Sequence, residues 1–174
     1  MKKATKKLIK ARKKMDKAVS AQLAPFGISK AKYNPDEYSY SFAKNRVDYK
    51  LSNNKIEDKW FREFLKERFN FDVTSDLIIS ILHEVGHAKA NEEIEGAIYD
   101  FCQREKIRIN VEMMGAEDET TGKALCYQYF NLPDEIMATQ WAVEYAETHE
   151  SELAEMLDEI TPAIKKYKKR LKAI

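Results

Sequence analysis

Cysteine is nearly absent from this 174-residue chain, which contains only Cys102 and Cys126. The two residues lack metal-ligand spacing, so reduced thiols of an intracellular protein are expected. Long apolar runs are also missing, and the longest is far too short to cross a membrane. Residues 1–7 have the positive charge of a signal-peptide start, but no apolar segment follows them. The sequence therefore predicts a cytoplasmic protein without a membrane span.

Net charge is low as well, because 30 Lys and Arg face 29 Asp and Glu, which leaves a formal charge of +1. The charges are nevertheless segregated. Residues 1–20 carry nine Lys or Arg and one acid, residues 124–164 carry nine acids and no Lys or Arg, and residues 165–172 are basic again. Basic ends can bind nucleic acid or an acidic partner. The absence of a stacking platform or groove-reading motif favours the alternative, solvated faces of terminal helices folded over the acidic segment.

Helical periodicity dominates the rest of the chain, and no internal repeat or low-complexity linker interrupts it. Helices are predicted over residues 3–23 and 56–69, from a cap at residues 74–76 to about residue 90, and over residues 92–106, 133–148 and 151–172. Thr161 and Pro162 are interpreted as a fresh helix start inside the last of these. Residues 107–113 fit a helix or a strand, and residues 115–122 are expected to form a polar loop.

Two Tyr-rich alternating segments, residues 38–42 and 47–51, predict short strands joined by a turn at residues 43–45. The predicted fold class is thus α+β, mostly helical with a small antiparallel or mixed sheet. The length fits one domain with helical appendages. The expected segments are a basic N-terminal helix over residues 1–24, the main domain over residues 25–150, and a C-terminal helical segment with a basic end over residues 151–174.

Two of only three histidines lie in residues 83–87, whose sequence His-Glu-Val-Gly-His is an HExxH motif. His83 and His87 are one helical turn apart, so their side chains project from the same face. Two imidazoles placed in this way can bind one Zn²⁺, and Glu84 lies beside them at the height needed to act on a water molecule. The apolar residues 77–82 predict that this helix is buried, where polar groups need partners. The alternative is a partly exposed helix with two solvated histidines.

A catalytic zinc site needs a third protein ligand, and several downstream residues are candidates. They are Glu93, Asp134, Glu135, Glu144 and His149. Glu93 has the spacing of a metzincin ligand, but Ala90 stands where that pattern needs a glycine. His149 lies in a polar, acid-rich stretch that is typical of a solvated histidine.

Glu135 begins a helical face that continues through Ala138, Thr139 and Ala142. Small side chains on this face allow another helix to approach closely, so Glu135 can reach that helix. The alternative gives Asp134 and Glu135 only an interaction with the helix dipole. Spacing by itself leaves both interpretations open.

Residues 83–87 and residues 135–142, Glu-Ile-Met-Ala-Thr-Gln-Trp-Ala, together resemble the HExGH and ExxA(N/D)xFA motifs of ImmA/IrrE-type metallopeptidases, a gluzincin-like branch of the zincins. The resemblance implies a zincin-like domain in which zinc is bound by three residues and Glu84 is the general base. The implied ligands are His83, His87 and Glu135.

The sequence departs from this family pattern in two places. Thr139 stands where the family has Asn or Asp, at a position that can hold the second ring N–H of a ligand histidine, and a hydroxyl is a weaker acceptor than a carboxylate. The interval from His87 to Glu135 is also longer than usual, so residues 92–125 would form an insertion.

The expected function is zinc-dependent hydrolysis of peptide bonds in a protein or peptide substrate. A further hydrogen-bond donor for the oxyanion would come from Tyr127, Tyr129, Tyr145 or His149. Thr139 is a candidate for an outer polar contact that orients a ligand histidine. The substrate would pair with the edge of the hairpin predicted over residues 38–51. Two other classes stay open: a non-proteolytic binding protein that retains the fold, with or without its metal, and a nucleic-acid-associated protein that acts through its basic ends.

Overall fold

The computed structural model describes residues 2–51, 55–90, 94 and 96–173. The chain divides into two compact units: unit 1 comprises residues 1–51 and 146–174, and unit 2 comprises residues 52–145. The described elements confirm a mostly helical α+β fold with a small sheet. The division differs from the segments expected from the sequence, because both terminal helices belong to the same unit as the strands.

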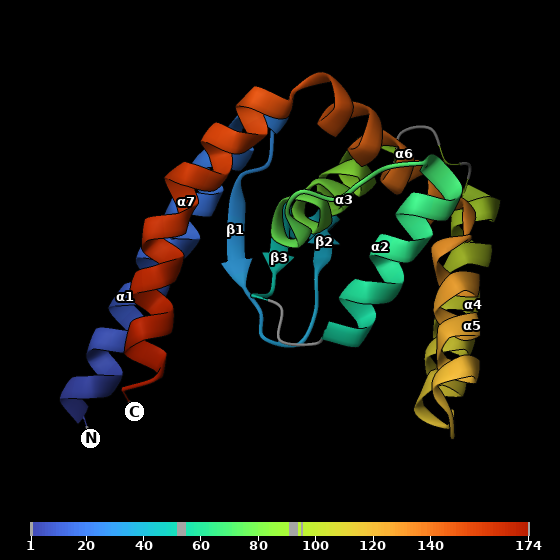
Figure 1. The fold of residues 1–174 in the computed structure, drawn as a ribbon, viewed down its shortest axis with the longest axis horizontal. Coiled ribbons are helices and arrows are strands. Elements are labelled where there is room, and N and C mark those ends of the chain that lie inside the picture. Colours follow the sequence, from blue (N-terminus) through green and yellow to red (C-terminus); the bar gives the residue numbers. More distant parts are fainter. Residues whose placement is uncertain (1, 52–54, 91–93, 95, 174) are drawn as a thin grey trace. The chain divides into compact units, whose positions relative to one another are not determined.

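Unit 1 is built around the pair of terminal helices, α1 (Lys2–Leu23) and α7 (Glu150–Leu171). The two helices lie side by side and antiparallel, with the N- and C-termini at the same end of the pair (Figure 1). Each contributes an apolar stripe with helical spacing to the core of the unit. The buried stripe residues are Ala11, Met15, Val19 and Leu23 of α1, and Met156, Ile160, Ile164 and Tyr167 of α7.

The last helix does not restart at Thr161 and Pro162, contrary to the prediction. α7 runs through Pro162 without a break, and the Thr161 hydroxyl donates a hydrogen bond to the Leu157 carbonyl 2.6 Å away. Burial of the apolar stripe on both sides of Pro162 outweighs the local cost of a proline inside a helix.

The sheet of unit 1 is mixed and has the order β1-β3-β2. Strand β1 (Lys30–Tyr33) pairs in parallel with β3 (Arg46–Tyr49), and β2 (Ser39–Ser41) pairs antiparallel with β3. The predicted β2–β3 hairpin is confirmed, and its turn is a short 3-10 segment, η2 (Phe42–Lys44), followed by Asn45 with a φ of 42°. β1 was missed: its residues alternate between polar and apolar side chains, but a run of only four is too short to be distinguished from the turn-rich segment around it.

Helix α1 covers the outer edge of β1 through polar side chains. The backbone N–H groups of Ala31 and Tyr33 donate to Ser20 Oγ and Asp16 Oδ1, each at 2.7 Å. Residues four apart on a helix and two apart on a strand have similar spacing, so two successive outward N–H groups are satisfied. Another short 3-10 segment, η1 (Ala24–Phe26), and Gly27 with a φ of 82° turn the chain from α1 toward β1. The opposite edge of the sheet is β2. Neither a further described strand nor a side chain of α1 forms hydrogen bonds with that edge.

Unit 2 contains helices α2 (Lys55–Phe69), α3 (Asp76–Ala90), α4 (Gly96–Met114) and α5 (Glu119–Phe130). Most of α6 (Pro133–Thr148) also belongs to it. Helices α2, α3 and α6 agree with the predictions. The segment at residues 107–113 continues α4, and α5 was missed: the predicted polar loop ends at Asp118, whose side chain caps α5 by accepting from the Thr121 N–H at 2.8 Å.

Helices α4 and α5 pack through an apolar cluster that contains Cys102, Ile109, Leu125 and Leu132. Both cysteines are buried, and neither forms a disulfide. Among the described residues, no helix has an apolar stretch long enough to cross a membrane.

Candidate metal centre

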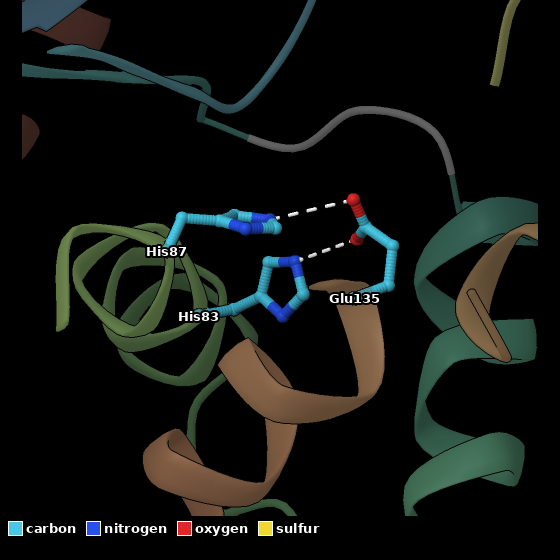
Figure 2. A group of neighbouring side chains, drawn as sticks. All are labelled: His83, His87 and Glu135. Atoms are coloured by element: carbon cyan, nitrogen blue, oxygen red, sulfur yellow. Dashed lines mark hydrogen bonds and ion pairs between the residues drawn. The ribbon is translucent and has the colours of Figure 1, made fainter. Parts of the chain in front are cut away.

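Helix α3 and the first turn of α6 bring His83, His87 and Glu135 together in unit 2. One potential ligand atom from each residue lies within 4.8 Å of the other two. His83 Nε2 is 2.9 Å from Glu135 Oε2, and His87 Nε2 is 3.4 Å from Glu135 Oε1. Figure 2 shows both rings projecting from α3 toward the carboxylate. The three residues predicted to hold a metal therefore face one another.

The close approach of α3 and α6 depends on a glycine. A Cβ atom added to Gly86 would lie 2.3 Å from the carbonyl oxygen of Ala138, which is far inside van der Waals contact. The facing positions Ala138 and Ala142 are fully buried and carry only methyl groups. Small residues on both helices thus allow the backbones to touch, and this contact places Glu135 opposite the two histidines.

Thr139 lies one turn after Glu135 and contacts the other nitrogen of His83. Its Oγ1 is 3.0 Å from His83 Nδ1. In the tautomer with a proton on Nδ1, the hydroxyl oxygen accepts from Nδ1–H and Nε2 has a lone pair for a metal. In the other tautomer, Nε2–H donates to Glu135 and the Thr139 hydroxyl donates to Nδ1. Thr139 is therefore placed to orient the His83 ring through its second nitrogen.

Apolar side chains shield the His83 ring. The ring of Phe61 on α2 meets it edge-on at a centroid distance of 5.8 Å, and Phe61 in turn packs against Phe130 at 5.3 Å. His83 is 9% exposed and Glu135 is 3% exposed. A buried carboxylate next to two imidazoles needs compensating partners, and a divalent cation is one such partner.

The charge of Glu135 is stabilised strongly by its neighbours. Burial by itself raises the pKa of a carboxyl group, but hydrogen bonds from His83 and His87 outweigh burial and hold the pKa of Glu135 well below the ordinary glutamate value. Glu135 is therefore a carboxylate at neutral pH, the form in which it can act as a ligand.

Lys106 on α4 is a residue of this centre that sequence reasoning missed. Its Nζ lies 2.5 Å from Glu135 Oε1 and 2.5 Å from Asp134 Oδ2, and its side chain is 15% exposed. Burial by itself lowers the pKa of a lysine, but the carboxylates of Glu135 and Asp134 outweigh burial and raise the pKa of Lys106. A signal was present, because Lys106 shares one helical face with Cys102 and Ile109, which are both buried.

Asp134 has a different role from the metal-ligand role considered for it. It is 3% exposed and pairs with Lys106, and its Oδ1 accepts from the Glu135 N–H at 3.0 Å. These contacts anchor the first turn of α6 and fix where the Glu135 side chain begins.

Glu84 is buried beside the histidines, with 6% exposure. Tyr129 of α5 lies close to it and to the cluster. Burial and then the charges of Glu135, Glu84 and Asp134 raise the pKa of Tyr129 far above that of a free tyrosine. The Tyr129 hydroxyl consequently keeps its proton and can donate a hydrogen bond within this centre.

The other candidates lie elsewhere or are engaged. Tyr145 follows Glu135 by ten residues on α6, which is about 15 Å along the helix, and its ring stacks on Trp141 at 5.3 Å. Glu144 is exposed and accepts from Gln140 at 2.8 Å. His149 Nδ1 is 2.7 Å from the Thr148 hydroxyl.

Tyr127 and Glu93 were also candidates. Tyr127 contacts Lys123 and the ring of Phe64. Glu93 lies outside the described residues.

Comparisons with protein-family models, with curated proteins and with solved structures find no match to this chain. Only the geometry and chemistry of unit 2 therefore bear on the function of the centre.

Proposed function

We propose that this protein is a zinc-dependent metallopeptidase whose metal is held by His83, His87 and Glu135. The buried cluster of these three side chains is the observation that carries the proposal. Two imidazole nitrogens and one carboxylate oxygen are a typical donor set for catalytic zinc, which leaves a further coordination position for the reaction. Thr139 supports the fit, because its hydroxyl can accept from Nδ1–H of His83 when Nε2 binds a metal.

Zinc held in this way supplies a Lewis acid that activates water and polarises a peptide carbonyl. Glu84 would accept the proton of the attacking water and deliver it to the leaving amine. Tyr129, which stays protonated next to Glu84 and Glu135, would donate a hydrogen bond to the developing oxyanion. Asp134 and Lys106 would hold Glu135 in place.

A second candidate is a non-proteolytic binding protein that uses the same fold. The contacts of Glu135 favour this candidate. Its carboxylate already has three partners, which are the rings of His83 and His87 and the ammonium group of Lys106. A carboxylate with three such partners is satisfied without a metal ion.

Metal analysis of the purified, zinc-supplied protein tests both candidates. The peptidase proposal expects about one zinc per chain, as for sites with three protein ligands, and loss of that zinc in His83→Ala and in Glu135→Ala. His149→Ala is the matched control, because it removes the one histidine outside the cluster and should leave zinc content unchanged. A chain that binds no zinc under these conditions contradicts the peptidase proposal.

Turnover is measured separately with a broad peptide library. Glu84→Gln should retain zinc and abolish cleavage, because the amide cannot accept the proton. If the wild-type protein binds zinc and cleaves no member of the library, the second candidate is preferred. Cleavage that persists in Glu84→Gln would exclude the proposed role of Glu84.

A further inference from the structure

Unit 1 brings the two basic ends of the chain together, although they are separated by almost its full length. Because α1 and α7 run antiparallel, the first turns of α1 lie beside the last turns of α7 (Figure 1). The aromatic contacts fix this alignment: the ring of Tyr167 on α7 packs on Tyr33 at 5.2 Å, and the Tyr33 N–H donates to Asp16 of α1.

The result is an exposed surface that consists almost entirely of cations. It comprises seven residues of α1 and six at the end of α7, hereafter the basic surface. These residues are Lys6, Lys7, Lys10, Arg12, Lys13, Lys14 and Lys17, with Lys165, Lys166, Lys168, Lys169, Arg170 and Lys172.

The cations of the basic surface are not neutralised within unit 1. None of the ion pairs found among the described residues includes any of them. The nearest acid in sequence, Asp16, is engaged by the Tyr33 N–H and by the Tyr49 hydroxyl at 3.0 Å.

The acids of α7 lie in its first half. Glu159, the last of them, precedes Lys165 by six residues and Lys168 by nine, which is about 9 and 14 Å along α7. Exposed charges are largely screened beyond about 8–10 Å in physiological salt, so Lys168, Lys169, Arg170 and Lys172 lie beyond the reach of these acids. Within unit 1, the two basic ends therefore lie beside each other. A surface with this charge attracts a polyanion.

The residue types on the basic surface indicate which class of polyanion it binds. All but two of the cations are lysines, which bind phosphates as point charges without the paired hydrogen bonds that arginine offers to a base edge. No aromatic side chain is exposed on the basic surface, since Tyr167 is buried, so single-stranded bases have no stacking partner.

A membrane surface is a poorer match than a nucleic acid. The apolar stripes of both helices are buried in the core of unit 1, and only Ile9 and Leu171 remain as large exposed apolar side chains near the basic surface. Interfacial helices need a broad apolar face for insertion into the headgroup region.

We propose that the basic surface binds the phosphate backbone of double-stranded nucleic acid without reading its sequence. From Lys6 to Lys17, α1 extends about 17 Å, a length over which duplex DNA presents about ten phosphate charges. The backbone of duplex DNA and that of duplex RNA offer the same phosphate chemistry. This binding does not depend on the metal centre in unit 2.

The test uses the full chain and fluorescent 20-base-pair duplexes of two unrelated DNA sequences, the matching RNA duplex, a single strand of equal length, and vesicles containing phosphatidylserine. Both DNA duplexes should bind equally, with affinity that falls steeply with salt and survives a zinc chelator. Equal binding of the RNA duplex would identify phosphate alone as the determinant, and preference for one duplex would show that groove geometry contributes.

A variant with Lys10→Gln, Lys13→Gln, Lys168→Gln and Lys169→Gln should lose at least about tenfold in duplex affinity, with a shallower salt dependence by about 2 to 4 units of slope. The matched control replaces four exposed lysines outside the basic surface, Lys44, Lys59, Lys66 and Lys89, and has the same net charge. It should bind like the wild type. Circular dichroism confirms that both variants are folded.

Three results would overturn the proposal. The first is an absence of duplex binding at about 50 mM salt, where such contacts are strong. The second is an equal loss of duplex affinity in the control variant, which would indicate an effect of net charge only. The third is tighter binding to vesicles or to the single strand than to the duplexes.

Discussion

Charged side chains are buried at the α3–α6 contact of unit 2 but exposed at the α1–α7 contact of unit 1. At the first, His83, Glu84, Asp134 and Glu135 are buried. At the second, the buried residues are apolar and the lysines and arginines are exposed. Buried charges must have partners, which fixes their positions within a hydrogen-bonded network. Exposed charges need no partner and act through their sum. The first arrangement suits a ligand that is held at one point, and the second suits an extended polyanion.

Lys106→Met should produce the largest effect on stability, because it leaves the buried carboxylates of Asp134 and Glu135 without their cation. Removing one partner of such a buried pair costs about 3 kcal/mol. Urea unfolding measures the loss, and added zinc should reduce it, since a divalent cation replaces the missing charge. Lys123→Met is the control: Lys123 pairs with the partly exposed Glu63 in solvent, so a much smaller loss is expected. Equal losses in the two variants would contradict the special position of Lys106.

Gly86→Ala should separate α3 from α6. The added methyl group meets the Ala138 carbonyl, and overpacking of this kind costs about 2 kcal/mol. Zinc binding should weaken together with stability, because Glu135 moves away from the histidines. Gly96→Ala is the control, since a Cβ there meets no atom within 4 Å. A Gly86→Ala protein with unchanged stability would show that the helices are not held at this contact.

Thr139→Val keeps the shape of the side chain but removes the oxygen that contacts His83 Nδ1. Loss of such an outer contact lowers metal affinity by about tenfold or more. Competition with a chelating dye measures the change. Thr139→Asp, which supplies a stronger acceptor, should bind zinc at least as tightly as the wild type. Unchanged zinc affinity in Thr139→Val would show that Thr139 does not contribute to the metal centre.

Ser20→Ala addresses unit 1 and has the smallest expected effect. The Ala31 N–H at the edge of β1 loses its acceptor, which costs about 1 kcal/mol. Hydrogen exchange at Ala31 should accelerate while exchange in α3 stays unchanged. Ser29→Ala is a suitable comparison, because its hydroxyl bonds are exposed. Faster exchange in α3 as well would mean that the two units do not unfold independently.

Local patterns in the sequence predicted the elements on which the centre is built. The apolar run of residues 77–82 and the HExxH spacing predicted α3, and the helix start at Pro133, Asp134 and Glu135 predicted α6. The same reasoning missed β1 and α5, because short or polar segments acquire their structure from contacts: β1 from the side chains of α1, and α5 from its packing on α4. It also misjudged Pro162, since propensity is weaker than burial of a long apolar stripe.

The sequence alone determined those features that depend on neighbours within a few residues along the chain. The helical repeat places His83 and His87 on one face and Glu84 beside them, so the HExxH pattern already specified three residues of the centre. Lysine runs at both ends likewise specified two basic segments.

Only the tertiary structure decided which distant residues complete each region. Glu135 meets His83 across 52 positions because Gly86 lets α6 approach α3, and Lys106 joins them from α4. The two basic ends become one surface because the apolar stripes of α1 and α7 align antiparallel. Such contacts are set by packing, which no local spacing encodes.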